Sequence, residues 1–187
     1  MRATFQMMEK YPRAFVFVLA CFVLVSFSGQ EGGRVQWMSF EEAVAQSKKV
    51  KKKIFIDVYT DWCGWCKVMD KNTFSDPEIA RVLNENFYPV KFNAEQREPV
   101  EFAGHTFRFI ESGRSGYHEL AASLLNNKLS YPSVVFLTEN FEMIQPLPGF
   151  HKPDEFHKII QYIGEDHFKS QSWNDFQKTY KSPYARK

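Results

Sequence analysis

The stretch Ile54-Phe55-Ile56-Asp57-Val58-Tyr59-Thr60-Asp61-Trp62-Cys63-Gly64-Trp65-Cys66-Lys67 is the most informative part of this chain. It joins an apolar run to two cysteines that are separated by two residues. A short apolar run of this kind is typical of a buried parallel strand. If a helix follows the strand, Cys63 lies at the helix N-terminus, where unpaired backbone N–H groups and the helix dipole favour a thiolate. The spacing therefore predicts a redox-active cysteine pair.

The two cysteines are expected to have different roles. Thiols in CxxC motifs have pKa values of about 3.5–7.5 instead of about 8.5, so a useful fraction is ionised near neutral pH. Cys63 is the predicted nucleophile, and Cys66, one helical turn later, is the predicted resolving thiol. Gly64 allows close approach of a backbone, and Trp65 covers the motif. Lys67 either adds positive charge beside the thiolate or is a solvated helix residue.

The segment from Ile54 to Lys67 resembles the active-site strand and helix of thioredoxin-family proteins. This resemblance implies that Asp57, six residues before Cys63, is the buried acid of the family and that Lys91 is its lysine partner. Together these two residues would manage the proton on Cys66. Desolvation raises the pKa of a carboxyl group in an apolar strand, which suits a general acid or base near neutral pH. The alternative for Asp57 is an acid at the strand end that faces water.

The segment Tyr131-Pro132-Ser133 precedes a further apolar run at 134–137 and is similar to the proline loop of the same family. In that fold the proline is cis and lies beside the CxxC motif, where the preceding backbone can pair with an extended substrate. A proline that begins a strand is the alternative. Gly149 fits the glycine that closes the last strand near the same site. The resemblance implies five substrate-binding residues: Trp62, Gly64, Trp65, Tyr131 and Pro132.

The order of the predicted elements agrees with an α/β thioredoxin-like fold, in which helices flank a central mixed sheet. Strands are expected at residues 53–60, 87–93, 133–138 and 142–147, and helices at 39–47, 63–71, 74–84 and 153–163. Ser39 and Glu42 form a predicted capping box on the first helix, and Trp37 is expected to pack under that helix. Ser75 is the predicted cap of the third helix, and Pro77 suits its first turn.

Two segments depart from a minimal thioredoxin-like domain, which covers residues 35–164. The first is an insertion at about 94–130. Its alternation and central glycine predict a small hairpin at 101–109, and a helix is expected at 116–127. The second is a C-terminal extension, 165–187, in which one extra helix at 166–180 is expected to pack outside the core.

Residues 1–28 have the pattern of an export signal. Lys10 and Arg13 precede an uncharged apolar stretch, 14–28, which is shorter than the ~20 residues of a membrane-spanning helix. We expect cleavage after Ser28 and a periplasmic location. An uncleaved signal would instead anchor the chain in the membrane, and so would a lipid on Cys21.

The composition gives no support for nucleic-acid binding. The chain has 187 residues, of which 44% are hydrophobic and 19 are phenylalanine, as expected for one domain with a full core. Loss of residues 1–28 would remove three of 24 basic residues and one of 22 acidic residues, leaving 21 of each. A neutral domain lacks the basic stripe of a nucleic-acid-binding protein. The lysine run within residues 48–53 is therefore expected to be a solvated loop.

The resemblance implies an exported thiol–disulfide oxidoreductase with no cofactor beyond its own Cys63–Cys66 disulfide. Only these two cysteines remain after signal removal, so the pair is expected to be reactive and not a structural staple. The implied partners are protein disulfide substrates and an upstream thiol electron donor, soluble or membrane-bound. The chain looks closest to exported proteins with a Trp-Cys-x-x-Cys-Lys site, including the C-terminal domains of transmembrane disulfide reductases. The redox potential sets the direction of transfer, and the Asp57–Lys91 pair favours a reductant or an isomerase.

Two other classes of function are compatible with the sequence. A copper or zinc carrier could use the CxxC motif together with histidines, although one CxxC supplies only two ligands and no second motif completes a site. A non-catalytic binding module could hold partner chains through the aromatic residues of the insertion, but aromatic residues at this spacing usually face a core. These aromatic residues are Phe102, Phe107, Phe109 and Tyr117.

Overall fold

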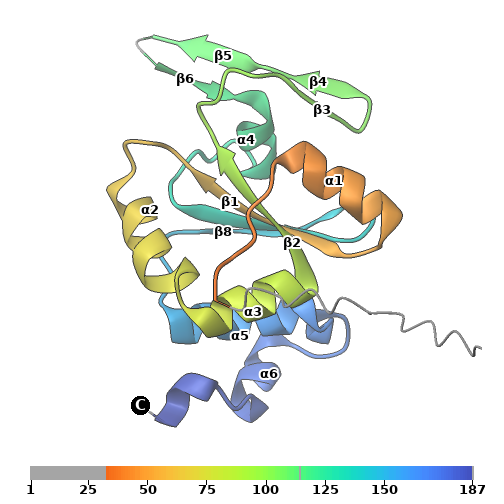
Figure 1. The fold of residues 1–187 in the computed structure, drawn as a ribbon, viewed down its shortest axis with the longest axis vertical. Helices are drawn as coiled ribbons and strands as arrows, with labels where there is room; N and C mark the ends of the chain where they lie inside the picture. The colour runs from red at the N-terminus through yellow and green to blue at the C-terminus, as the bar shows by residue number, and fades with distance from the viewer. Residues whose placement is uncertain (1–32, 114, 187) are drawn as a thin grey trace, which may run out of the picture. The chain divides into compact units, whose positions relative to one another are not determined.

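A four-stranded mixed sheet is the centre of the computed structural model, which describes residues 33–113 and 115–186 (Figure 1). The strand order is β2-β1-β7-β8. β1 pairs in parallel with β2, whereas the β1–β7 and β7–β8 pairs are antiparallel. The predicted mixed sheet is therefore confirmed. The strands are β1 (Lys53–Tyr59), β2 (Phe87–Asn93), β7 (Ser133–Leu137) and β8 (Met143–Pro148).

Helices cover both faces of this sheet. On one face α1 (Phe40–Lys49) and α4 (Glu119–Leu124) pack against Ile54, Ile56 and Val58. Because side chains alternate along a strand, Phe55 and Asp57 are directed to the other face. That face is covered by three helices, α2 (Gly64–Met69), α3 (Pro77–Asn86) and α5 (Pro153–Gly164). The interior of β1 is thus buried on both sides, as its continuous apolar sequence predicts.

Two predictions about the first helices need correction, and one is confirmed. The capping box of Ser39 and Glu42 is present on α1. Asp76, not Ser75, caps α3, and its Oδ1 accepts hydrogen bonds from the backbone N–H groups of Glu78 and Ile79. Ser75 is unsuitable because it has helical backbone angles, and it ends the π-helical turn η1 (Asp70–Phe74). Trp37 does not pack under α1, because it contacts Phe55 on the opposite sheet face.

The insertion contains two hairpins and a short helix in place of the predicted single hairpin and long helix. β3 (Val100–Phe102) pairs with β4 (His105–Phe107), and β5 (Phe109–Ser112) pairs with β6 (Ser115–His118). Residues 116–118, expected to be helical, are therefore in a strand. A Cβ atom on Gly116 would collide with the Phe109 ring and with the Ile110 carbonyl oxygen, so this pairing requires glycine. The two hairpins lie near α4 at the top of Figure 1.

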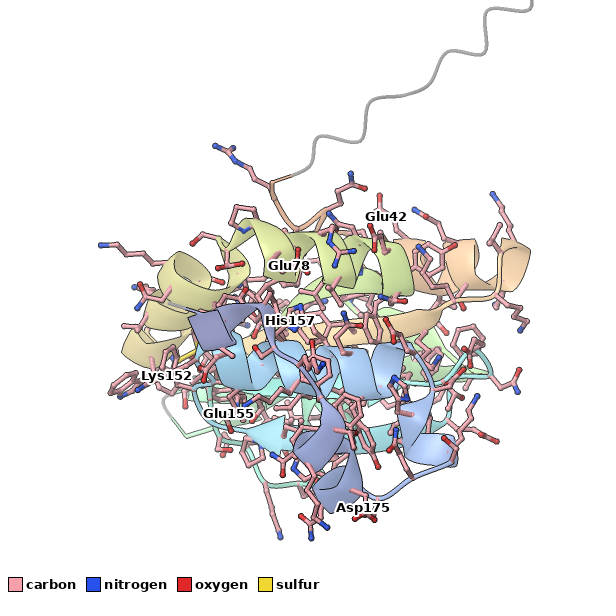
Figure 2. All side chains as sticks on the ribbon, turned by 90° about the horizontal axis from the view of Figure 1, so that it is seen from below. Glu42, Glu78, Lys152, Glu155, His157 and Asp175 are labelled. Carbon is pink, nitrogen blue, oxygen red and sulfur yellow. A yellow bond between two sulfur atoms is a disulfide. The ribbon has the colours of Figure 1, made fainter. Side chains whose placement is uncertain are left out.

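The C-terminal extension contains two short helices and a final turn in place of one long helix. These are η2 (His167–Lys169), α6 (Trp173–Thr179) and η3 (Pro183–Arg186). Asp166 has a φ of 62°, which breaks the helix before η2, and Ser172 caps α6. The extension packs on α5, where Tyr180 donates a hydrogen bond of 2.5 Å to His157 Nδ1. Figure 2 shows His157 on α5 beside Glu78 on α3. The distance between His157 Nε2 and Glu78 Oε1 is 3.2 Å.

The prediction that the lysine run is a solvated loop is wrong for Lys53, which is buried at the start of β1. Its side chain is 4% exposed, and its Nζ lies 3.0 Å from Glu139 and 2.8 Å from Asp166. Lys52 and Lys53 differ because only Lys53 belongs to the first strand. The other lysines of the run are exposed or half-buried, as predicted, but Lys48 and Lys49 belong to the last turn of α1 and not to a loop.

The expectations for residues 1–28 lie outside the described residues. These include the export signal, its cleavage after Ser28 and the lipid on Cys21. Within residues 33–113 and 115–186, no helix has the length and apolar character needed to cross a membrane.

Candidate redox site

Cys63 and Cys66 form a disulfide at the start of α2, with 2.09 Å between their sulfur atoms. Cys63 is the N-cap of α2, and its Sγ accepts a hydrogen bond of 3.1 Å from the Cys66 N–H. The backbone of Cys63 is held to the end of β1 by a 3.1 Å bond from its N–H to the Thr60 carbonyl. The sulfur therefore lies where free N–H groups and the helix dipole stabilise negative charge. This is the geometry that the spacing predicts.

Two exposed tryptophans flank the buried disulfide. The cysteines are 4% and 3% exposed, whereas Trp62 is 66% and Trp65 62% exposed. The Trp62 ring lies edge-on to Tyr131 at 6.0 Å, and its Nε1 donates to Glu95 Oε1 at 3.0 Å. Trp65 packs at 5.6 Å from Phe150. These two rings form an exposed apolar patch around the disulfide.

The proline loop lies beside this surface. The Tyr131–Pro132 peptide bond is cis, as the resemblance implies. The register pairs Ser133 with Val58, which places Pro132 near the end of β1 where the CxxC segment begins. Gly149, in the left-handed region with a φ of 97°, donates its N–H to the Pro132 carbonyl at 2.8 Å. A small groove of about 240 Å³ is lined by Trp65, Tyr131, Pro132, Gly149 and Phe150.

Asp57 is the buried acid of the site. It faces the side of the sheet that α2 covers, and its Oδ2 lies 2.7 Å from Lys91 Nζ. The other carboxylate oxygen, Oδ1, has no hydrogen-bond partner among the described residues. Burial raises the pKa of Asp57 to about 6, against the opposing attraction of Lys91. The carboxyl group can therefore gain and lose a proton close to neutral pH.

Lys91 lies opposite Asp57 in the β1–β2 register and forms a second ion pair, with Asp70. Its Nζ is 5.0 Å from the ring centre of Trp37 and 5.1 Å from that of Tyr59. Burial opposes the charge on Lys91, but the two carboxylates outweigh burial and raise the pKa of the ammonium group. Lys91 therefore stays protonated and supplies positive charge beside Asp57.

Sequence reasoning missed three residues that complete the site. Asp70 lies one helical turn after Cys66, and that i,i+4 spacing was the available signal for a second acid. Phe150 follows the predicted Gly149, and Glu95 follows the second strand. Nothing local in the sequence pairs Phe150 with Trp65 or Glu95 with Trp62, because these contacts join segments more than 30 residues apart.

The histidines do not gather around the cysteines. Among the residues that the structure describes, no group of three or more His, Cys, Asp or Glu side chains is placed to hold a metal ion. His118 bonds to the Glu98 carbonyl and the Leu120 N–H, and His157 bonds to Tyr180 and Glu78. These two histidines therefore serve the packing of the insertion and of the C-terminal extension.

A protein-family model matches residues 29–165 of this chain. Its name is Thioredox_DsbH, and it is described as a protein of unknown function, DUF255. The chain belongs to the Thioredox_DsbH family. The match spans β1, the CxxC segment, the proline loop and α5, so family membership includes every element of the site.

Curated relatives of this Thioredox_DsbH chain are much longer proteins. The uncharacterized protein B0495.5 of Caenorhabditis elegans is 30% identical over 124 residues, which is 65% of this chain and 15% of that protein. The thiol:disulfide interchange protein DsbD of Vibrio vulnificus is 40% identical over 45 residues, 24% of this chain and 8% of that protein. The chain spans 11–15% of the length of the first curated relatives.

A solved structure has the same fold as this family member. The structure of the DsbH oxidoreductase aligns with a TM-score of 0.52 and 18% identity, over 72% of this chain and 87% of that chain. At this identity the likeness concerns the fold, which is confirmed as thioredoxin-like. The chain thus combines a thioredoxin-like fold with a bonded cysteine pair at the start of α2.

Proposed function

We propose that this protein exchanges two electrons between its Cys63–Cys66 pair and the disulfides of other proteins. The observation that carries this proposal is the bonded pair at the N-terminus of α2, with cis Pro132 beside it. Exposed Trp62 and Trp65 around the pair support a protein as the substrate. No cofactor is needed, since the cysteines themselves hold the electrons.

Reduction of a substrate proceeds in two displacement steps. The Cys63 thiolate attacks one sulfur of the substrate disulfide, forms a mixed disulfide and releases the first substrate thiolate, which takes a proton. The Cys66 thiolate then attacks Cys63 Sγ, closes the Cys63–Cys66 disulfide and releases the second substrate thiolate. The substrate gains two electrons and the pair loses two. A dithiol donor restores the reduced pair by the same two steps.

Asp57 serves the second step by accepting the proton of the Cys66 thiol. Its raised pKa suits this role, because a carboxylate with an ordinary pKa is a weaker base at neutral pH. Lys91 and Asp70 act through Asp57 as positioning residues: the first holds its carboxylate and the second holds the lysine.

The direction of electron flow is proposed to be reductive or isomerising, in an exported protein. The proton acceptor Asp57 supports this direction, and the signal-like residues 1–28 support export into the periplasm. Equilibration of the pair with glutathione buffers, read by thiol alkylation, tests the direction. A potential near that of the strong oxidant DsbA, about −120 mV, would contradict it.

Replacing the resolving cysteine tests the catalytic assignment. In Cys66→Ala the first step still occurs but the second cannot, so mixed disulfides with partner proteins should accumulate on Cys63. The measurement is non-reducing electrophoresis followed by mass spectrometry of the bands that dithiothreitol removes. The matched control is Cys63→Ala, which should form few such adducts. If Cys66→Ala traps no partner, or Cys63→Ala traps as many, the assignment is wrong.

A further inference from the structure

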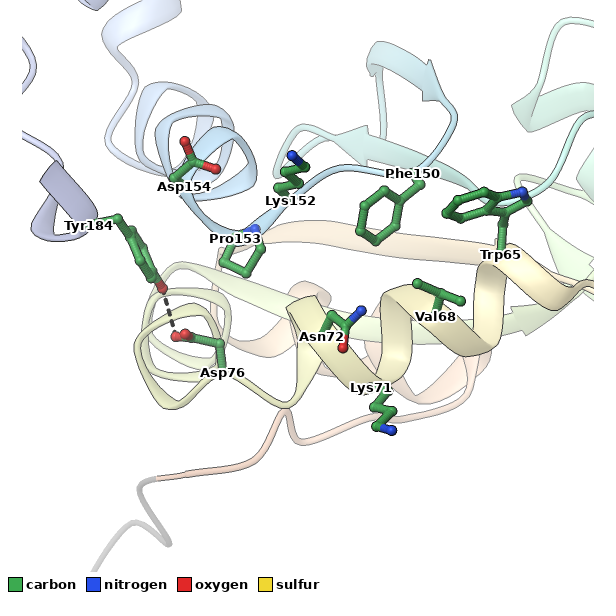
Figure 3. Close-up of a pocket in the computed structure, with 10 residues that line it drawn as sticks. All are labelled: Trp65, Val68, Lys71, Asn72, Asp76, Phe150, Lys152, Pro153, Asp154 and Tyr184. Atoms are coloured by element: carbon green, nitrogen blue, oxygen red, sulfur yellow. Dashed lines mark hydrogen bonds between the residues drawn. The ribbon is translucent and has the colours of Figure 1, made fainter. Parts of the chain in front are cut away.

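A second, larger groove begins at Trp65, next to the Cys63–Cys66 pair in the chain, and runs along α2 (Figure 3). It has a volume of about 860 Å³ and mostly apolar walls. Trp65 and Val68 of α2 line one side, and Phe150 and Pro153 line the other. The remaining lining residues are Lys71, Asn72, Asp76, Lys152, Asp154 and Tyr184.

The large groove is continuous with the small groove at the proline loop. Trp65 and Phe150 line both of them, so the two grooves meet at this pair of rings. Cys63 and Cys66 lie at the start of the same helix as Trp65 and Val68. The two shared rings therefore extend an apolar surface from Pro132 to the groove along α2, next to the helix end that holds Cys63.

The far end of the groove is formed by the C-terminal extension. The Tyr184 hydroxyl donates a 2.6 Å hydrogen bond to Asp76 Oδ1, the same oxygen that caps α3 (Figure 3). The Tyr184 ring also lies 5.6 Å from the buried His157. These two contacts hold the tyrosine in place. The extension thus contributes a side chain to a surface that reaches the redox site.

From this arrangement we propose that the large groove binds the chain segment next to the reacting cysteine of a protein disulfide substrate. The segment is extended and carries apolar side chains. Residues 65–72 rise about 10 Å along the helix, a distance that three or four extended residues cover. This inference rests on the proposed exchange activity. It adds a substrate class: flexible segments with apolar residues on one side of the cysteine, either N-terminal or C-terminal to it.

The test uses three peptides, each joined through its single cysteine to glutathione by a disulfide, as substrates for reduction. One has a short polar sequence around the cysteine, and two others carry four apolar residues on its N-terminal or its C-terminal side. We measure kcat/KM for their reduction by the reduced protein. One apolar peptide is expected to react at least about tenfold faster than the short one, since a buried apolar side chain contributes this much binding energy.

Variants assign that preference to the groove. Val68→Glu and Tyr184→Ala should each remove most of the preference for the apolar peptide, while Tyr184→Phe, which keeps the ring, should retain most of it. Leu129→Glu is the matched control, because Leu129 is an exposed leucine outside both grooves. Thermal melting of each variant separates loss of the groove from loss of the fold.

Each outcome decides between the two proposals. Equal rates for all three peptides, or a preference that survives both Val68→Glu and Tyr184→Ala, would overturn the groove while the turnover of the short peptide upheld exchange activity. Failure to reduce any peptide would overturn the exchange activity and the groove with it. A dimer in sedimentation experiments that Val68→Glu dissociates would assign the groove to a second copy and overturn its role in substrate binding.

Discussion

A single carboxyl group, Asp57, links the stability of this protein to its chemistry. Burial raises its pKa to about 6, above the ordinary value of 3.8. The folded protein therefore binds this proton more tightly than the unfolded chain does. An ionised Asp57 destabilises the folded state at a pH above about 6, and this cost is absent below the ordinary pKa. The same raised pKa fits the role proposed for Asp57 as the base that accepts the Cys66 proton.

Asp57→Asn should therefore stabilise the protein and slow its chemistry. The free energy of unfolding of the oxidised form should rise by about 2–3 kcal/mol at pH 8, because two pKa units correspond to about that energy. The gain should shrink as the pH falls from 6 to below 4. Urea unfolding at pH 4 and pH 8 measures this change.

The chemical effect of the same variant is slower closure of the Cys63–Cys66 disulfide in single-turnover experiments. Glu142→Gln, at an exposed glutamate, is the control and should change stability little at either pH. A variant that is less stable than the wild type at pH 8 would show that ionised Asp57 stabilises the fold.

At the scale of the element, α6 has little intrinsic stability and depends on one buried ring. The helix has seven residues, too few for an isolated helix in water. Phe176 is its buried residue, and its ring lies 5.1 Å from Tyr162, 4.9 Å from His167 and 4.9 Å from Tyr180. Only Tyr162 of these three belongs to α5, so its contact with Phe176 holds α6 to the domain, together with the hydrogen bond between Tyr180 and His157.

Phe176→Ala should release the extension locally. Truncation of a buried phenylalanine costs about 3–5 kcal/mol. This exceeds the free energy that keeps a peripheral segment of this size docked, so the segment should open locally. Hydrogen exchange should show loss of protection at residues 172–180, with unchanged protection in β1. The control is Gln177→Ala, at an exposed neighbour. Equal loss of protection in β1 and α6 would instead mean that the extension and the sheet unfold together.

At the scale of the whole molecule, Lys53 ties together three segments that are distant in sequence. Its ammonium group joins the start of β1 to Glu139, after β7, and to Asp166, after α5. Burial raises the pKa of both acids, but hydrogen bonds and positive charge outweigh burial, so both have a lowered pKa. For Glu139 these are its own backbone N–H and Lys53, and for Asp166 they are Lys53 and Lys169. Their contribution to stability is complete above the ordinary pKa values of 4.5 and 3.8, and it is lost as the pH falls through the lower folded values.

Lys53→Met should lower the free energy of unfolding by about 1–2 kcal/mol at pH 7. This is less than the loss of a fully buried ion pair, because both acids are partly exposed. The difference from wild type should shrink below about pH 4 as the carboxylates protonate. Denaturant unfolding at pH 7 and pH 3 measures it, and Lys128→Met, at an exposed lysine, is the control. A pH-independent difference would assign the effect to packing of the lysine stem.

Local patterns in the sequence determined much of this protein. The apolar run of β1, the CxxC spacing, the capping box at Ser39 and the Pro132 loop each depend on neighbouring residues, and all four are present in the structure. The predictions that were wrong concern segments in which two local structures, or two candidate cap residues, compete. Residues 115–118 form a strand and not a helix because Gly116 permits close packing on Phe109. Asp76 and not Ser75 caps α3 because Ser75 has helical backbone angles at the end of the preceding turn.

Tertiary structure alone decided which side chains meet. The pairing of β1 with β2 brings Lys91 to Asp57, and η1 then brings Asp70 to the same lysine. The contact of Trp65 with Phe150 and the position of Tyr184 at the end of the large groove also join segments far apart along the chain. A sequence pattern reports the environment of neighbours within a few residues. The partners of a buried charge and the walls of a groove depend instead on how strands and helices pack, which no short stretch encodes.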